Sequence, residues 1–208
     1  MILISDNDIL LKLSACHLME EAVVALESAL ADVYVLSTAR YKISRDRGGK
    51  LQSRYGADGV AGALAFIDSV SEIDQEPLPG EQVVLAQVED IDPGEQILFG
   101  ATAYFNPFLL ATGDKRSLRA LWSAPACAPI CVRMSGRVLC LEQIVSRLVP
   151  HLGFDEIRSR IVPARECDTV LKAAFGSGLQ AEESQVLQHL ANRVMELRAD
   201  TGHLLHPL

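Results

Sequence analysis

Short apolar segments that alternate with longer amphipathic stretches are the feature that most constrains how this chain can fold. Four such segments are flanked by polar or turn-forming residues: Met1–Ser5, Val33–Ser37, Phe108–Ala111 and Ile130–Met134. Between them, apolar residues recur near the helical spacing of 3.6. Strands that alternate with helices form parallel sheets, so the sequence predicts an α/β domain with a mainly parallel sheet. Because apolar parallel strands are buried on both sides, we expect helices on both faces of the sheet.

The helices expected between these strands differ in how clearly they begin. Helical spacing starts at Ile9 and continues to Leu30, and two shorter helices are expected at Val60–Val70 and Glu81–Val88. The clearest helix start lies at Asp92. Asp92 suits an N-cap, with Pro93 at the first helical position and Glu95 at the third, which is the pattern of a capping box. A further helix is expected at Lys115–Trp122.

From residue 136 onward the pattern is helical only. We expect an α/β domain at 1–135 and a helical extension at 136–208, with helices at Val138–Val149, Asp155–Ile161, Asp168–Phe175 and Glu182–Arg198. The last helix carries an apolar stripe: Val186, Leu187, Leu190, Val194 and Leu197. An isolated amphipathic helix is marginal in water, so the stripe is expected to pack on the α/β domain or to pair with a second copy in a homo-oligomer.

The charge of the chain is unevenly distributed. The formal net charge is −8, which argues against general binding of polyanions. The segment between Arg40 and Arg54 is an exception, since six basic residues stand against one acid and give +5. Gly48-Gly49 marks a loop in this segment. It follows the second strand, so we expect it near the edge of the sheet where the strands end.

Several features favour a cytoplasmic protein without membrane segments. No apolar run approaches the roughly 20 residues that cross a bilayer, and the N-terminus lacks the basic start of a secretory signal. The five cysteines, Cys16, Cys127, Cys131, Cys140 and Cys167, form no CxxC pair. They are expected to be reduced structural thiols in the cytosol.

Three acids are expected at one edge of the sheet. Asp6 follows the first strand, Asp114 follows the strand Phe108–Ala111, and Glu95 lies in the first turn of the helix before that strand. Ligands of open parallel sheets bind at the carboxyl ends of the strands. Three carboxylates repel one another unless a cation neutralises them, and Mg²⁺ or Mn²⁺ prefers such oxygen ligands. Asp6, Glu95 and Asp114 are therefore the candidate metal-binding and catalytic residues.

At these residues the chain resembles the PIN-domain family of metal-dependent nucleases. The matching motifs are Ile2–Asp6 followed by Asn7–Leu11, then Asp92-Pro93-Gly94-Glu95, and finally Leu109–Leu121 with Thr112-Gly113-Asp114 at its centre. The resemblance covers about residues 1–135. It implies a ribonuclease that cleaves RNA phosphodiesters with Mg²⁺ or Mn²⁺ held by the three acids. Many members of the family are toxins with antitoxin partners, so the resemblance also implies an antitoxin-like protein partner.

One stretch departs from the pattern of the family. PIN nucleases usually carry another acid on the helix after the second strand, where this chain has Arg40 and Lys42. Positive charge there favours phosphate over metal. The residues expected to contact RNA are Arg40, Lys42, Arg45, Arg47, Lys115 and Arg116. Asp8 or Asp92 could replace the missing acid, and weak, Mn²⁺-stimulated cleavage is expected.

Two alternatives remain open from the sequence. The missing acid suits a PIN-like module that binds nucleic acid or protein without cleaving RNA. Asp6-Asn7-Asp8 also resembles the nucleophile motif of haloacid-dehalogenase-type phosphohydrolases, with Gly113-Asp114 as the late acidic motif, although Ile9 fits that family poorly. Taken singly, Asp6 and Asp114 suit helix N-caps as well as ligands.

Overall fold

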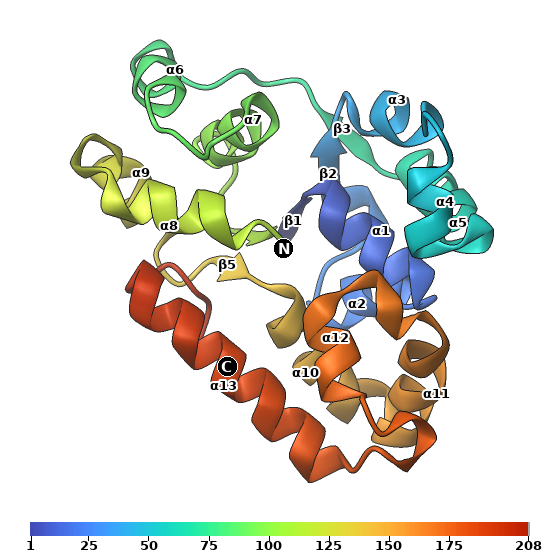
Figure 1. Cartoon of the computed structure of the whole chain (residues 1–208). Coiled ribbons are helices and arrows are strands. Elements are labelled where there is room, and N and C mark those ends of the chain that lie inside the picture. The colour runs from blue at the N-terminus through green and yellow to red at the C-terminus, as the bar shows by residue number, and fades with distance from the viewer. Residues whose placement is uncertain (208) are drawn as a thin grey trace.

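A five-stranded parallel sheet lies at the centre of the structure, a computed structural model that describes residues 1–207 (Figure 1). The strand order is β3-β2-β1-β4-β5. The strands are β1 (Ile2–Ser5), β2 (Val33–Leu36), β3 (Ser71–Ile73), β4 (Phe108–Ala111) and β5 (Val138–Leu139). All four neighbouring pairs are parallel, which confirms the expected α/β class and a parallel sheet.

The path of the chain reverses direction at β1. It runs outward from β1 to β2 and β3, then returns to the other side of β1 for β4 and β5. At the reversal, Ser5 of β1 lies opposite Ala111 of β4. The connections leave β1 and β4 toward opposite edges of the sheet, which opens a crevice at their carboxyl ends. Asp6 and Asp114 follow these two strands, so the topology brings them to the crevice.

Within residues 1–207, nine α-helices connect the strands in two groups. The first is α1 (Asn7–Ala15), α2 (Met19–Ala25), α3 (Ala39–Ser44), α4 (Lys50–Tyr55) and α5 (Ala57–Ile67); the second is α6 (Pro79–Ala86), α7 (Pro93–Ala101), α8 (Lys115–Ser123) and α9 (Ala128–Met134). Right-handed crossovers toward opposite edges place the two groups on opposite faces of the sheet. Figure 1 shows α6–α9 on one side of the strands and α3–α5 on the other.

The last strand is not the one that the sequence predicts. Ile130–Met134 was expected as a strand but lies in α9, so that prediction is wrong. Ile130, Cys131 and Met134 are buried whereas Val132 is 70% exposed, which is the pattern of one helical face. The strand is instead Val138–Leu139, at the start of the expected helix Val138–Val149. The sheet therefore continues past residue 135, where the α/β domain was expected to end.

Three local features also differ from expectation. The edge strand β3 was not predicted, because only Ile73 of its three residues is buried. The helix expected from Ile9 to Leu30 is interrupted at His17, which has a φ of 52°. Instead of one loop, the basic segment forms α3 and α4 around a turn at Gly48 and Gly49, both at positive φ.

The C-terminal region is helical and packs on the rest of the chain. It contains α10 (Leu141–Leu152), α11 (Phe154–Ala164), α12 (Thr169–Ala174) and α13 (Glu183–Thr201). The long α13 packs against α8, α10 and α12 (Figure 1). Four residues of its stripe, Val186, Leu190, Val194 and Leu197, are buried, which confirms the prediction that the stripe is covered. The cover comes from this chain, so the stripe provides no surface for a second copy.

Residues beyond α13 return to the sheet. The amide of Gly136 donates to the carbonyl of His203, and the amide of His206 donates to the carbonyl of Val138, both at 2.8 Å. Leu204 and Leu205 are buried beside them. This return gives β5 a partner on its outer side. No helix within residues 1–207 is long and apolar enough to span a membrane.

Candidate functional site

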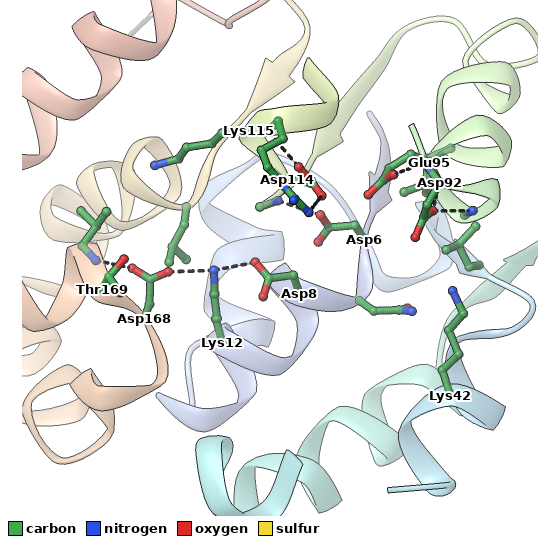
Figure 2. A pocket seen from close by; sticks show the side chains of 18 of the residues that line it. Asp6, Asp8, Lys12, Lys42, Asp92, Glu95, Asp114, Lys115, Asp168 and Thr169 are labelled. Atoms are coloured by element: carbon green, nitrogen blue, oxygen red, sulfur yellow. Dashed lines mark hydrogen bonds and ion pairs between the residues drawn. The ribbon is translucent and has the colours of Figure 1, made fainter. Parts of the chain in front are cut away.

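A cleft of about 540 Å³ lies at the carboxyl edge of the sheet (Figure 2). Asp6, Glu95 and Asp114, predicted from the sequence as one site, all line it. The other charged residues that line it are Asp8, Lys12, Lys42, Arg54, Asp92, Lys115, Arg116, Glu142 and Asp168. The cleft therefore combines acids and bases from the α/β part with residues from the C-terminal region.

Asp6 connects β1 to the loop after β4. It is the N-cap of α1, and its Oδ1 accepts from the amide of Ile9 at 2.7 Å. Its Oδ2 accepts from the hydroxyl of Thr112 and the amide of Gly113, each at 2.7 Å. Burial, and then the charge of Asp8, raise the pKa of Asp6 to about 6 against these hydrogen bonds. Asp6 is thus held rigidly and is costly to ionise.

Glu95 is drawn into the cleft by a capping box at the start of α7. Asp92 accepts from the amide of Glu95 at 2.9 Å, and Glu95 Oε2 accepts from the amide of Asp92 at 2.6 Å. The expected capping box is therefore confirmed. Burial raises the pKa of Glu95 to about 8, and the charges of Asp92 and Asp114 add to the shift, together with a hydrogen bond to Asp114. The carboxylates of Glu95 and Asp114 therefore lie close enough to interact at the cleft.

Asp114 is the N-cap of α8. Its Oδ1 accepts from the amides of Arg116 at 2.8 Å and Ser117 at 3.0 Å. Each acid of the predicted site therefore also helps to cap a helix, so the capping and site interpretations are compatible. The N-termini of α1, α7 and α8 meet at the cleft, and their dipoles favour negative charge there.

The carboxylate oxygens of the three acids are suitable ligands for a hard cation, but their side chains are not arranged as a preformed metal site. Within residues 1–207, no three His, Cys, Asp or Glu side chains form a group that could hold a metal ion as they stand. Glu95 Oε1 and Asp114 Oδ2 are not used by the caps. Carboxylate oxygens are the ligands that Mg²⁺ and Mn²⁺ prefer. A cation would also relieve the repulsion that raises the pKa of Glu95.

A buried ion-pair network, absent from the predicted site, forms one wall of the cleft. Lys12 is only 6% exposed, and its Nζ lies 2.5 Å from Asp8 Oδ2 and 2.7 Å from Asp168 Oδ2. Burial alone would lower the pKa of Lys12, but the charges of both aspartates raise it above its ordinary value. The i,i+4 spacing of Asp8 and Lys12 was a usable signal in the sequence. Nothing local in the sequence points to Asp168.

Glu142 is a second residue that the sequence did not reveal. It is 1% exposed and forms an ion pair with Lys115. It lies in the first turn of α10, directly after β5. Because a helix was expected from Val138, the sequence did not predict the end of a strand at Leu139. Glu142 was therefore not expected at the carboxyl edge of the sheet.

The basic residues predicted to bind RNA fall into two sets. Lys42, Lys115 and Arg116 line the cleft, whereas Arg40, Arg45 and Arg47 do not. Arg40 pairs with Asp68, and the guanidinium of Arg45 lies 4.5 Å from the ring centroid of Tyr41. Arg54, not predicted for this role, also lines the cleft, and its Nε donates to the carbonyl of Cys167 at 3.0 Å.

Comparisons with known proteins do not indicate a function for this chain. No family model, curated protein or solved structure matches the chain. What the cleft can do therefore follows from its own residues, which combine crowded carboxylates with lysines and two arginines that suit a phosphate.

Proposed function

We propose that this chain is a PIN-like, metal-dependent ribonuclease that cleaves RNA phosphodiesters in the cleft. The observation that carries the proposal is that Asp6, Glu95 and Asp114 line one cleft at the reversal point of a parallel sheet. Lys42 and Lys115 line the same cleft, as expected of a site for a charged backbone.

The charges divide the cleft into two parts. Lys12 pairs with both Asp8 and Asp168, and Lys115 pairs with Glu142. Within residues 1–207, Asp6 and Glu95 have no ion-pair partner. This unneutralised part is where a cation would gain most, and the basic residues beside it would take the phosphate.

Each residue has a distinct role in the proposal. Asp6, Glu95 and Asp114 would hold Mg²⁺ or Mn²⁺, which when bound activates water and neutralises the charge on phosphate. Lys42 and Lys115 bind and orient the RNA backbone. The hydrogen bonds from Thr112 and Gly113 keep Asp6 in place while substrate enters and product leaves.

A metal titration with cleavage assays tests the proposal. Mn²⁺ should raise the melting temperature of the wild type, since a ligand that binds only the folded state stabilises it. Weak, Mn²⁺-stimulated cleavage of RNA should accompany this. Asp6→Asn and Asp114→Asn should abolish cleavage and reduce the stabilisation. Asp200→Asn is the control, because Asp200 is half-exposed on α13 and pairs with Arg119. A wild type that gains nothing from divalent metals and does not bind RNA at low salt would refute the proposal.

A second candidate is a PIN-like module that binds RNA without cleaving it. It is favoured by Lys42, which lines the cleft from the helix after β2, where the PIN resemblance leads one to expect an acid. Binding of RNA in EDTA, with no cleavage on addition of Mn²⁺, would support this candidate over the nuclease. An antitoxin-like protein partner stays a prediction of the same resemblance, and co-purification would test it.

The phosphohydrolase alternative has less support from the cleft. Its motif needs Asp8 as a second acid near Asp6. Asp8 is instead bound by Lys12, and its Oδ1 accepts from the hydroxyl of Tyr55 at 3.3 Å. An assay with an aryl phosphate would reveal such an activity.

A further inference from the structure

Glu142 and Lys115 occupy comparable places in the helices that follow two neighbouring strands, β5 and β4. Ala111 of β4 pairs with Leu139 of β5, and the amide of Thr112 donates to the carbonyl of Leu139 at 2.9 Å. This pairing fixes the first turn of α10 beside the first turn of α8. Glu142 follows Leu139 by three residues and Lys115 follows Ala111 by four, so both side chains reach the same side of the cleft.

The burial of Glu142 is unusual for a carboxylate. It is 1% exposed, and its Oε2 is buried without a hydrogen-bond partner in the described part of the chain. Burying a carboxylate is costly unless it is paired. The ammonium of Lys115 is the counter-charge, and its side chain is 28% exposed. The acid is therefore hidden while the lysine reaches the cleft.

This asymmetry leaves Lys115 available for an anion. An ammonium has three N–H donors, of which the pair with Glu142 uses one. A free lysine side chain loses much rotamer entropy when it is fixed on a ligand, and prior fixation removes that cost. Arg116, by contrast, is 76% exposed and lies 4.0 Å from Asp114. Of Lys115 and Arg116, only Lys115 is fixed by a buried partner before a ligand binds.

We propose that Glu142 is a positioning residue, which holds the ammonium of Lys115 toward the phosphate of bound RNA. This inference rests on the proposed function, because it assumes that RNA occupies the cleft. It assigns the C-terminal region a part in that function, since Glu142 belongs to α10. Glu142 does not itself touch the RNA.

The direction in which Glu142→Gln changes the affinity for RNA separates a positioning role from a purely electrostatic one. Removing a negative charge near an anionic ligand should tighten binding if the charge acts only through space. If Glu142 positions Lys115, Glu142→Gln should weaken binding of RNA instead. We expect a loss of about tenfold, the value of one charge-assisted hydrogen bond.

The experiment measures fluorescence anisotropy of a short labelled single-stranded RNA at low salt in EDTA. The proteins are the wild type, Glu142→Gln, Lys115→Met and the double variant. Lys115→Met should weaken binding as Glu142→Gln does, and the double variant should bind no more weakly than Lys115→Met, because both changes remove one contact. Glu81→Gln is the matched control, since Glu81 forms a half-buried pair with Arg133 outside the cleft. It should leave the affinity unchanged.

The outcomes distinguish this inference from the proposed function. A folded Glu142→Gln variant that binds as tightly as the wild type, or more tightly, overturns the role of Glu142 and leaves the nuclease proposal intact. A wild type that does not bind RNA overturns both. If Glu142→Gln does not fold, Glu142→Asp takes its place, because aspartate keeps the charge but shortens the reach. The same loss of affinity is then expected, and wild-type affinity overturns the inference.

Discussion

The ammonium of Lys12 lies 2.7 Å from the carboxylate of Asp168, so a residue of α1 and the N-cap of α12 share a buried ion pair. The two residues are far apart in sequence and both line the cleft. Asp8 completes the network from the other side of Lys12. The pair joins the C-terminal region to the helix that follows β1, and Lys12 also pairs with Asp8, whose charge acts on Asp6.

Lys12→Met should destabilise the protein strongly. It leaves the buried carboxylate of Asp168 and the partly exposed carboxylate of Asp8 without their counter-charge. Breaking a buried pair costs about 3–5 kcal/mol. Urea denaturation measures the free energy of unfolding. Arg119→Met is the control, since Arg119 and Asp200 are 43% and 50% exposed. It should cost less than about 1 kcal/mol. Similar losses in the two variants would show that the Lys12 network is not a structural link.

Glu95 should make stability fall as pH rises. The pKa of Glu95 is about 8 in the folded chain against an ordinary 4.5, so the folded state binds more protons between these values. The free energy of unfolding therefore decreases from pH 4.5 to pH 8. Glu95→Gln keeps the capping bond but removes the charge. Its melting temperature should exceed that of the wild type at pH 8, because neither the burial of a charge nor its repulsion by Asp92 and Asp114 remains. We expect about 2–4 °C for each kcal/mol gained.

The control for this effect is Glu166→Gln, because Glu166 is 65% exposed and lies outside the cleft. Its melting temperature should follow that of the wild type at both ends of the pH range. Asp6 acts in the same direction at lower pH, since its pKa of about 6 exceeds an ordinary 3.8. A wild type whose stability rises between pH 4.5 and pH 8 would contradict the assignment.

Gly113→Ala should disturb the cleft through a steric contact. A Cβ on Gly113 would lie 2.0 Å from Asp8 Oδ2, and Asp8 is itself held by Lys12. We expect a loss of about 1–3 kcal/mol in thermal or urea unfolding, as for overpacking. Gly80→Ala is the control, because a Cβ there meets nothing within 4 Å. In helix α6 it should be neutral or stabilise by up to about 1 kcal/mol. Equal effects would mean that Asp8 moves aside freely.

Lys42→Ala should weaken RNA binding more than Arg47→Ala. Lys42 lines the cleft, whereas Arg47 is exposed outside it. Loss of one phosphate contact should reduce the slope of log affinity against log salt by about 0.7 for a single strand. Titrations of RNA binding at several salt concentrations measure the slope. Equal losses in both variants would instead show that the RNA path extends from the cleft along the basic segment.

Local signals in the sequence were sufficient for much of the site. Asp6 and Asp114 follow apolar strands, and Glu95 belongs to a short-range capping pattern with Asp92, so local sequence patterns predict all three acids. Each depends on hydrogen bonds to residues a few positions away. Such interactions are encoded locally, and parallel pairing of β1 with β4 then brings the acids together.

Contacts between residues far apart in the sequence decided the last strand and the other acids of the cleft. Two-residue β5 is a strand because β4 and the residues after α13 hydrogen-bond to it, whereas Ile130–Met134 is just as apolar and is a helix. A strand gains its hydrogen bonds only from neighbours, so its own residues do not identify it. The sequence by itself predicted Asp6, Glu95 and Asp114 as residues of the candidate site. The tertiary structure alone decided that Glu142 and Asp168 join them, because their partners Lys115 and Lys12 are brought near only by the packing of the C-terminal region.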